Sequence, residues 1–103
     1  MDETTTESPE HRLKRLHMRS WRRGMKEMDL ILGHFADDRL SRLDAGELDL
    51  YERLLSENDQ DLYLWVTARI GAEAPAGRSQ PDPALEPMLD VIAAHAAARF
   101  AAD

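Results

Sequence analysis

Apolar residues recur along this chain three or four positions apart, and they almost never alternate with polar residues. The clearest case is "MKEMDLILGHF", in which Met25, Met28, Leu32 and Phe35 keep this spacing and Ile31 stands beside them. Such spacing places side chains on one face of an α-helix, whereas alternation would place them on one face of a strand. We therefore predict an all-α fold.

Start and stop signals divide the chain into five helices. Ser8 is a suitable N-cap and is followed by proline, so a first helix is expected over residues 9–20. The second helix is expected to end near Ala36, before "DDRLSR". Asp44 and Glu47 form an acidic version of the capping box, which predicts the start of the third helix.

The remaining boundaries come from breaker residues. The fourth helix follows "SENDQD" and should end before Gly71, and the fifth should begin near Pro87. Residues 1–8 are acidic and polar, which predicts a disordered N-terminus, and residues 72–83 are rich in Ala, Pro, Gly and Ser, which predicts a flexible linker. A chain of 103 residues suits one domain, so residues 9–103 should form a small five-helix bundle.

The predicted core is mainly aliphatic, because only 6% of the residues are aromatic. On the first four helices it contains Leu16, Met28, Leu32, Leu48, Tyr51, Leu55, Leu62 and Trp65, with Leu13 and Trp21 facing it. On the last helix, Leu89, Ile92 and Phe100 are expected on one side.

Composition restricts the compartment and excludes several kinds of site. The chain has no cysteine, which excludes disulfides and thiolate metal sites. The start "MDETTTESPE" lacks the basic and apolar parts of a secretory signal. The Ala-rich "VIAAHAAARFAAD" is interrupted by His95 and Arg99 and falls short of the ~20 apolar residues of a membrane-spanning helix. We predict a soluble, cytoplasmic protein without membrane insertion.

The net charge of −7 is unevenly distributed. Residues 1–10 carry −4, residues 11–28 carry +6 and residues 29–103 carry −9. A basic segment beside an acidic body could bind nucleic acid, bind an acidic partner, or pair with the protein's own carboxylates. Nucleic acid is the less favoured partner, because the basic segment lacks interleaved aromatic residues and the acidic body would repel phosphates.

Candidate catalytic and metal-binding residues do not form a convincing constellation. The histidines are spread over three predicted helices, and no two are spaced to share one helical face: His11, His17, His34 and His95. The carboxylates Asp37, Asp38, Asp59 and Asp61 fall at predicted helix ends, where we interpret them as caps and partners of the helix dipole. We therefore predict no catalytic residues, no metal site and no enzymatic activity.

The junction of the first two helices carries the pattern RGxxE, formed by Arg23, Gly24 and Glu27 and preceded by Arg22. A glycine here permits a positive φ, and it also leaves room for close approach by another chain. The arginines near one helix end and Glu27 near the next helix start also complement the helix dipoles. The residues alone leave both a helix terminator and a docking surface open.

Two longer segments allow a comparison with a known family. "RRGMKEMDLILGHFA" followed by "LDAGELDLYERLLSENDQDLYLWV" closely resembles the succinate dehydrogenase assembly factors that promote covalent flavin attachment in bacteria and mitochondria. The resemblance covers about residues 12–70 and implies a five-helix bundle. It also implies binding to the flavoprotein subunit of succinate dehydrogenase or fumarate reductase, in which FAD becomes linked to a histidine. FAD would then belong to that client, and no stably bound cofactor is expected in this chain.

The same resemblance implies a partner-binding role for Arg23, Gly24 and Glu27, to which we add their neighbours Arg22 and Asp29. Arg23 and Glu27 are expected to be exposed, so their replacement by alanine should weaken binding without changing stability. The connection "AEAPAGRSQPDPALEP" departs from the family pattern, so no role is assigned to residues 72–103. The expected function is that of a monomeric assembly chaperone that holds its client in a reactive arrangement.

Overall fold

The computed structural model describes residues 7–71 and 80–101 of the chain, and within them it contains helices and no strands. The five α-helices are α1 (Pro9–Trp21), α2 (Lys26–Arg39), α3 (Ala45–Leu55), α4 (Asp59–Arg69) and α5 (Glu86–Ala101). Two short 3₁₀ helices, η2 (Leu40–Arg42) and η3 (Pro83–Leu85), follow α2 and precede α5. The predicted all-α class and the five helices are confirmed.

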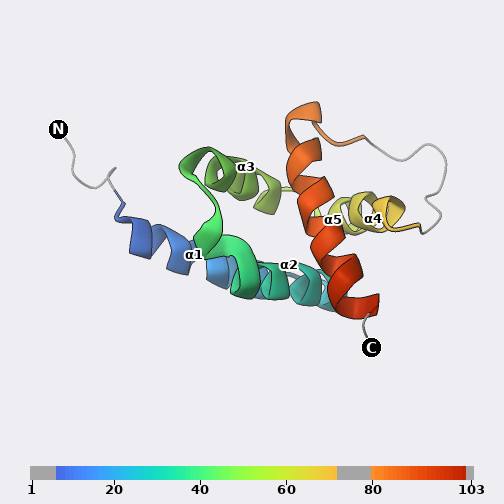
Figure 1. The fold of residues 1–103 in the computed structure, drawn as a ribbon, viewed down its shortest axis with the longest axis horizontal. Coiled ribbons are helices and arrows are strands. Elements are labelled where there is room, and N and C mark those ends of the chain that lie inside the picture. The colour runs from blue at the N-terminus through green and yellow to red at the C-terminus, as the bar shows by residue number, and fades with distance from the viewer. Residues whose placement is uncertain (1–6, 72–79, 102–103) are drawn as a thin grey trace.

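α1 and α2 pack as an antiparallel pair, and the other three helices pack around this pair (Figure 1). α1 and α2 lie side by side and are joined by the short turn at residues 22–25, and α5 crosses α2 and α4 (Figure 1). α3 contacts α1 on one side and α5 on the other. This arrangement brings the turn between α1 and α2 close to the start of α4, which is far from it in sequence.

Local capping explains most of the helix starts. The Ser8 hydroxyl accepts a hydrogen bond from the His11 amide at 3.1 Å, and α1 begins at the proline as predicted. Asp44 and Glu47 form the reciprocal capping box expected for α3, with N···O distances of 2.8 and 2.9 Å. Asn58 caps α4 by accepting from two backbone amides.

The predicted end of α2 near Ala36 is wrong. The helix continues to Arg39 and passes into η2, because Leu40 extends the apolar stripe and is almost completely buried. Asp37 and Asp38 do not end the helix as caps. They sit near its negative end and are compensated by neighbouring helices, since Asp37 accepts from His17 and Trp21 while Asp38 accepts from His95 and Arg99.

The core agrees closely with the apolar pattern. All eight positions expected on the first four helices are buried except Leu48, which is partly buried against the core, and Leu89 and Ile92 are fully buried. Phe100, which was expected on the same side of the last helix as Leu89 and Ile92, is 41% exposed. Its ring meets His34 edge-on at a centroid distance of 6.1 Å, at the end of α5 and at the rim of the core.

Trp21 has a different role from the one expected. It is half-buried and lies across α2 at Gly33, where an added Cβ would overlap the indole ring. Its Nε1 donates to Asp37 at 3.2 Å. Gly33 therefore allows α1 and α2 to approach closely, a role that the sequence analysis did not assign to it.

The expected segments at 1–8 and 72–83 are only partly described. Residues 1–6 and 72–79 lie outside the described residues. Glu7 pairs with Arg15 at 2.8 Å, Pro81 is buried, and Asp82 caps η3 and pairs with Arg53 at 2.8 Å. Pro81, Asp82 and Leu85 thus hold this part of the chain against the bundle before α5 begins.

We expect the free energy of unfolding to fall as pH is lowered below about 4. Hydrogen bonds from His17 and His95 hold the pKa values of Asp37 and Asp38 below their usual range, and a hydrogen bond from Arg15 does the same for Glu52. Groups with a depressed folded pKa contribute stability that is present above the unfolded value of ~4 and lost as pH falls through the folded one.

Urea midpoints measured from pH 6 down to pH 2.5 test this dependence. In the double variant Asp37→Asn/Asp38→Asn, the urea midpoint should fall less steeply with pH than in the wild type, because two of the carboxylates with a lowered pKa are gone. A wild-type midpoint that stays constant between pH 5 and pH 3 would contradict the assignment.

Candidate functional site: the turn between the first two helices

The residues of the RGxxE pattern lie at the turn between α1 and α2, but they do not share one environment. Arg22 ends α1 by donating its amide to Met18, and its side chain is exposed. Gly24 and Glu27 are also exposed. Arg23 points inward.

Arg23 is the best-connected side chain of the turn, and only 9% of it is exposed. Its Nε donates to Asp59 Oδ1 at 2.7 Å, and its two terminal nitrogens donate to the carbonyls of Leu55 at 2.8 Å and Glu57 at 3.2 Å. These acceptors belong to the end of α3, the α3–α4 connection and the start of α4. Arg23 therefore fastens the connection between α3 and α4 to the end of α1.

The expectation that Arg23 is exposed is thus wrong, because its guanidinium pairs with Asp59. Asp59 was interpreted as a helix cap, but Asn58 fills that position. The Asp59 carboxylate is free to bind Arg23 through one oxygen and the Gly24 amide, at 3.0 Å, through the other. Asn58 alone supplies the oxygen that caps α4, so the carboxylate of the adjacent Asp59 is left for another donor. Two such acceptors side by side at one helix start are the signal in the sequence that could have identified Asp59 as the partner of Arg23.

Asp29 completes the turn from the other side. Its carboxylate accepts the Arg23 amide at 2.6 Å, so successive backbone amides of the turn, those of Arg23 and Gly24, are each held by a carboxylate. The side chain is half-buried. Within the described residues, its visible role is to hold the backbone of the turn.

The backbone conformation at position 24 does not explain why this residue is a glycine. Among the described residues, the one glycine with a positive φ is Gly71, at +97°. α1 already ends at Trp21 with Arg22 as its C-cap, so Gly24 is not the terminator of that helix. A Cβ added at Gly24 would meet Asp59 Oδ2 at 3.8 Å, an ordinary van der Waals contact. Of the two interpretations left open by the sequence, the helix terminator is therefore excluded.

Around Gly24 the surface forms an open polar depression of about 630 Å³. It is lined by residues of the turn, of α2 and of the start of α4: Gly24, Met25, Lys26, Glu27, Asn58, Asp59 and Gln60. Among the described residues, none pairs with the Glu27 carboxylate or the Lys26 amine. The depression thus presents a bare backbone segment beside one free negative and one free positive charge.

Three of the seven basic residues among residues 11–28 are paired with carboxylates of the protein itself. Arg12 pairs with Asp49 and Glu52, and Arg15 pairs with Glu7 and Glu52. Arg23 is likewise occupied, as described above. The charge left for an external polyanion is smaller than the sequence indicated, which weakens the nucleic-acid interpretation.

Two of the four histidines each pair with one carboxylate. His17 lies 2.5 Å from Asp37, and His95 lies 2.7 Å from Asp38. Residues 7–71 and 80–101 contain no group of three or more side chains suited to hold a metal ion. In the same residues, no helix is both long and apolar enough to cross a membrane.

The structure is thus a small helical bundle in which Arg23, Asp29 and Asp59 hold the turn between α1 and α2 and leave Gly24 exposed. Residues 14–96 match the family described as the flavinator of succinate dehydrogenase. The chain therefore belongs to this family, and the resemblance found in the sequence is confirmed.

Curated relatives carry a consistent name. The chain is 47% identical over 53 residues to "Succinate dehydrogenase assembly factor 2, mitochondrial" of Aspergillus flavus, which covers 52% of this chain and 18% of that protein. The proteins of the same name in Meyerozyma guilliermondii and Scheffersomyces stipitis are 43% and 44% identical over 63 and 61 residues, covering 61% and 59% of this chain and 47% and 41% of theirs. The chain thus spans less than half the length of these relatives. No solved structure was found to match it.

Proposed function

We propose that this protein binds the flavoprotein subunit of succinate dehydrogenase and promotes the covalent attachment of FAD to it. Family membership and the names of the relatives support the assembly role. The observation that carries the binding role is Gly24, whose side-chain position is empty although the fold would accept a Cβ there. An empty position that the chain itself does not need is suited to close contact with another protein.

The proposed contribution is positioning and not chemistry. The exposed groups at the turn are a carboxylate, an amine and a guanidinium, and no nucleophile with an adjacent base stands among them. We propose that the protein holds the client so that the client's own histidine can attack the flavin. FAD would then be bound by the client, and this chain would be neither an enzyme nor a stable FAD carrier.

Three finer features belong to the same proposal. The flavoprotein of fumarate reductase is proposed as a second client, the protein is proposed to act as a monomer, and its compartment is proposed to be the cytoplasm. The relatives from Meyerozyma guilliermondii and Scheffersomyces stipitis are named as mitochondrial proteins. The second client, the monomeric state and the compartment can each be measured in the cells that contain the client flavoprotein.

Removal of the protein from its native cell should leave the client flavoprotein synthesised but poorly flavinated. The measurement is flavin fluorescence in a denaturing gel, because only covalently attached FAD remains with the polypeptide there. Immunodetection of the client in the same gel controls for its amount. Normal fluorescence per client molecule in the absence of this protein would contradict the proposal.

A further inference from the structure

A second surface lies next to the turn and is apolar. Among the described residues, the large hydrophobic side chains that are exposed are Met18, Leu30, Ile70, Val91 and Phe100, each between 37% and 45% exposed. Three of them, Leu30, Ile70 and Phe100, line one groove of about 250 Å³ between α2, α4 and α5, which we call the apolar groove. The full lining of the apolar groove is Glu27, Leu30, Ile31, Tyr63, Thr67, Ile70 and Phe100.

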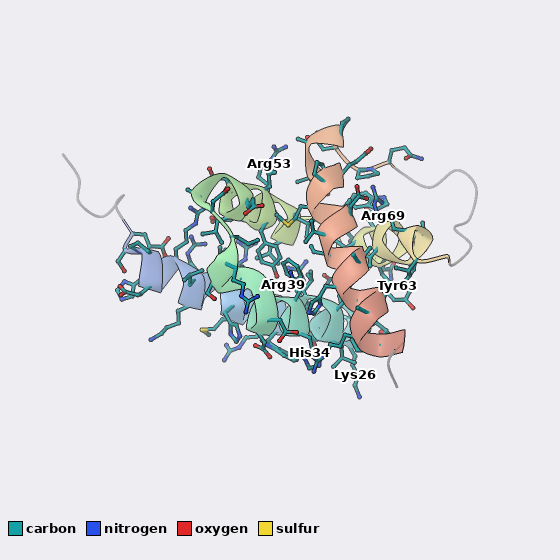
Figure 2. The ribbon with its side chains drawn as sticks, viewed as in Figure 1. Lys26, His34, Arg39, Arg53, Tyr63 and Arg69 are labelled. Atoms are coloured by element: carbon teal, nitrogen blue, oxygen red, sulfur yellow. The ribbon has the colours of Figure 1, made fainter. Side chains whose placement is uncertain are left out.

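The clustering is notable because these side chains come from three separate helices. Leu30 is on α2, Ile70 directly follows α4, and Phe100 is near the end of α5. Tyr63 and His34 lie near the last turns of α5 in Figure 2, and His34 packs edge-on against Phe100. Scattered exposed apolar residues need no explanation, but a joined patch is typical of an interaction site.

Glu27 connects this groove to the turn. It lines both the polar depression around Gly24 and the apolar groove, since it lies one helical turn before Leu30 and Ile31 on α2. Its carboxylate has no partner among the described residues. The two hollows therefore form one continuous surface with a free negative charge at their junction.

We propose that the apolar groove receives a bulky apolar side chain of the client flavoprotein, next to a lysine or arginine of the same client segment that pairs with Glu27. This inference rests on the proposed function, because it takes the flavoprotein subunit as the partner that covers Gly24. Because Glu27 is negatively charged, the client residue that pairs with it should be basic. Because the groove has an apolar lining, the neighbouring client residue that enters it should be apolar.

The size of the groove favours a side chain as its occupant. Pockets for drug-sized ligands and cofactors range over ~300–1,000 Å³, and this groove falls below that range. A flavin ring system would also need polar groups to fix its orientation, whereas the groove is lined mostly by carbon. A protein segment can anchor one large residue here while its backbone continues over the turn.

The test measures binding of the purified client flavoprotein subunit to Ile70→Ser, Phe100→Ser and Val91→Ser. The first two variants should each weaken binding about tenfold or more, because an anchoring apolar contact is lost. Val91→Ser is the matched control, since Val91 is 45% exposed on α5 but does not line the groove, and its affinity should stay within about twofold. Helical circular dichroism checks that all three variants fold.

A charge pair tests the basic residue of the occupant. Ile70→Lys should bind more weakly than Ile70→Glu. A lysine in the groove would repel the basic residue of the client that pairs with Glu27, whereas a glutamate there would attract it. Equal affinities for the wild type, Ile70→Ser and Phe100→Ser would overturn the groove inference while leaving the proposed function intact. A wild-type protein that does not bind the flavoprotein at all would overturn the proposed function, and this inference with it.

Discussion

Replacing Gly24 with arginine is expected to abolish binding of the client flavoprotein while leaving the bundle folded. The position is exposed, and a Cβ there makes only an ordinary contact with Asp59. The added side chain therefore has room in the isolated protein and conflicts only with a partner seated on the turn. Binding should fall by at least about a hundredfold, as is typical when the centre of an interface is blocked.

Two further variants separate this steric effect from a change in stability. Gly24→Ala should melt close to the wild type, because the position does not use the positive φ that favours glycine. Gly46→Arg adds the same side chain at an exposed glycine on the first turn of α3 and should bind normally. Binding by Gly24→Arg at wild-type affinity would show that the turn is not covered by the client.

Replacing Arg23 with alanine is expected to destabilise the protein by about 2–4 kcal/mol. The change removes three side-chain hydrogen bonds and leaves the mostly buried Asp59 carboxylate without its cation. The carbonyls of Leu55 and Glu57 lose their donor as well. Any loss of client binding by this variant would therefore be partly indirect, through loosening of the turn.

Arg22→Ala is the matched control for Arg23→Ala. Its side chain is exposed and has no hydrogen bond or ion pair within the described residues, so its free energy of unfolding should change by less than about 0.5 kcal/mol. Urea denaturation of both variants gives the comparison. Equal stability of Arg23→Ala and the wild type would show that the contacts of the guanidinium contribute nothing to folding.

The helices could be predicted because their signals are local. The periodic stripe of α2 and the capping box at Asp44 depend on residues within one or two turns, and both are found in the structure. Phe100 has the helical spacing of the buried Leu89 and Ile92 and is nevertheless exposed, because periodicity gives the side of a helix that faces the core. It does not say where along the helix the core ends.

The sequence singles out the segment around Gly24, but it does not predict the contacts made there. It favours an exposed Arg23, because the acceptor of its guanidinium is 36 residues away. Long-range pairs of this kind leave no periodic trace. The same limit hid the contact between Trp21 and Gly33, which joins two helices through an empty side-chain position.

The most direct test of the account is cross-linking from defined positions on α2. Lys26 and Arg39 lie toward opposite ends of this helix (Figure 2), and the exposed Glu27 stands next to the former. A photoreactive residue at position 27 should cross-link to the flavoprotein subunit of succinate dehydrogenase, and one at the exposed position 39 should not. Cross-linking from position 39 but not from position 27 would contradict the assignment of the turn as the client-binding surface.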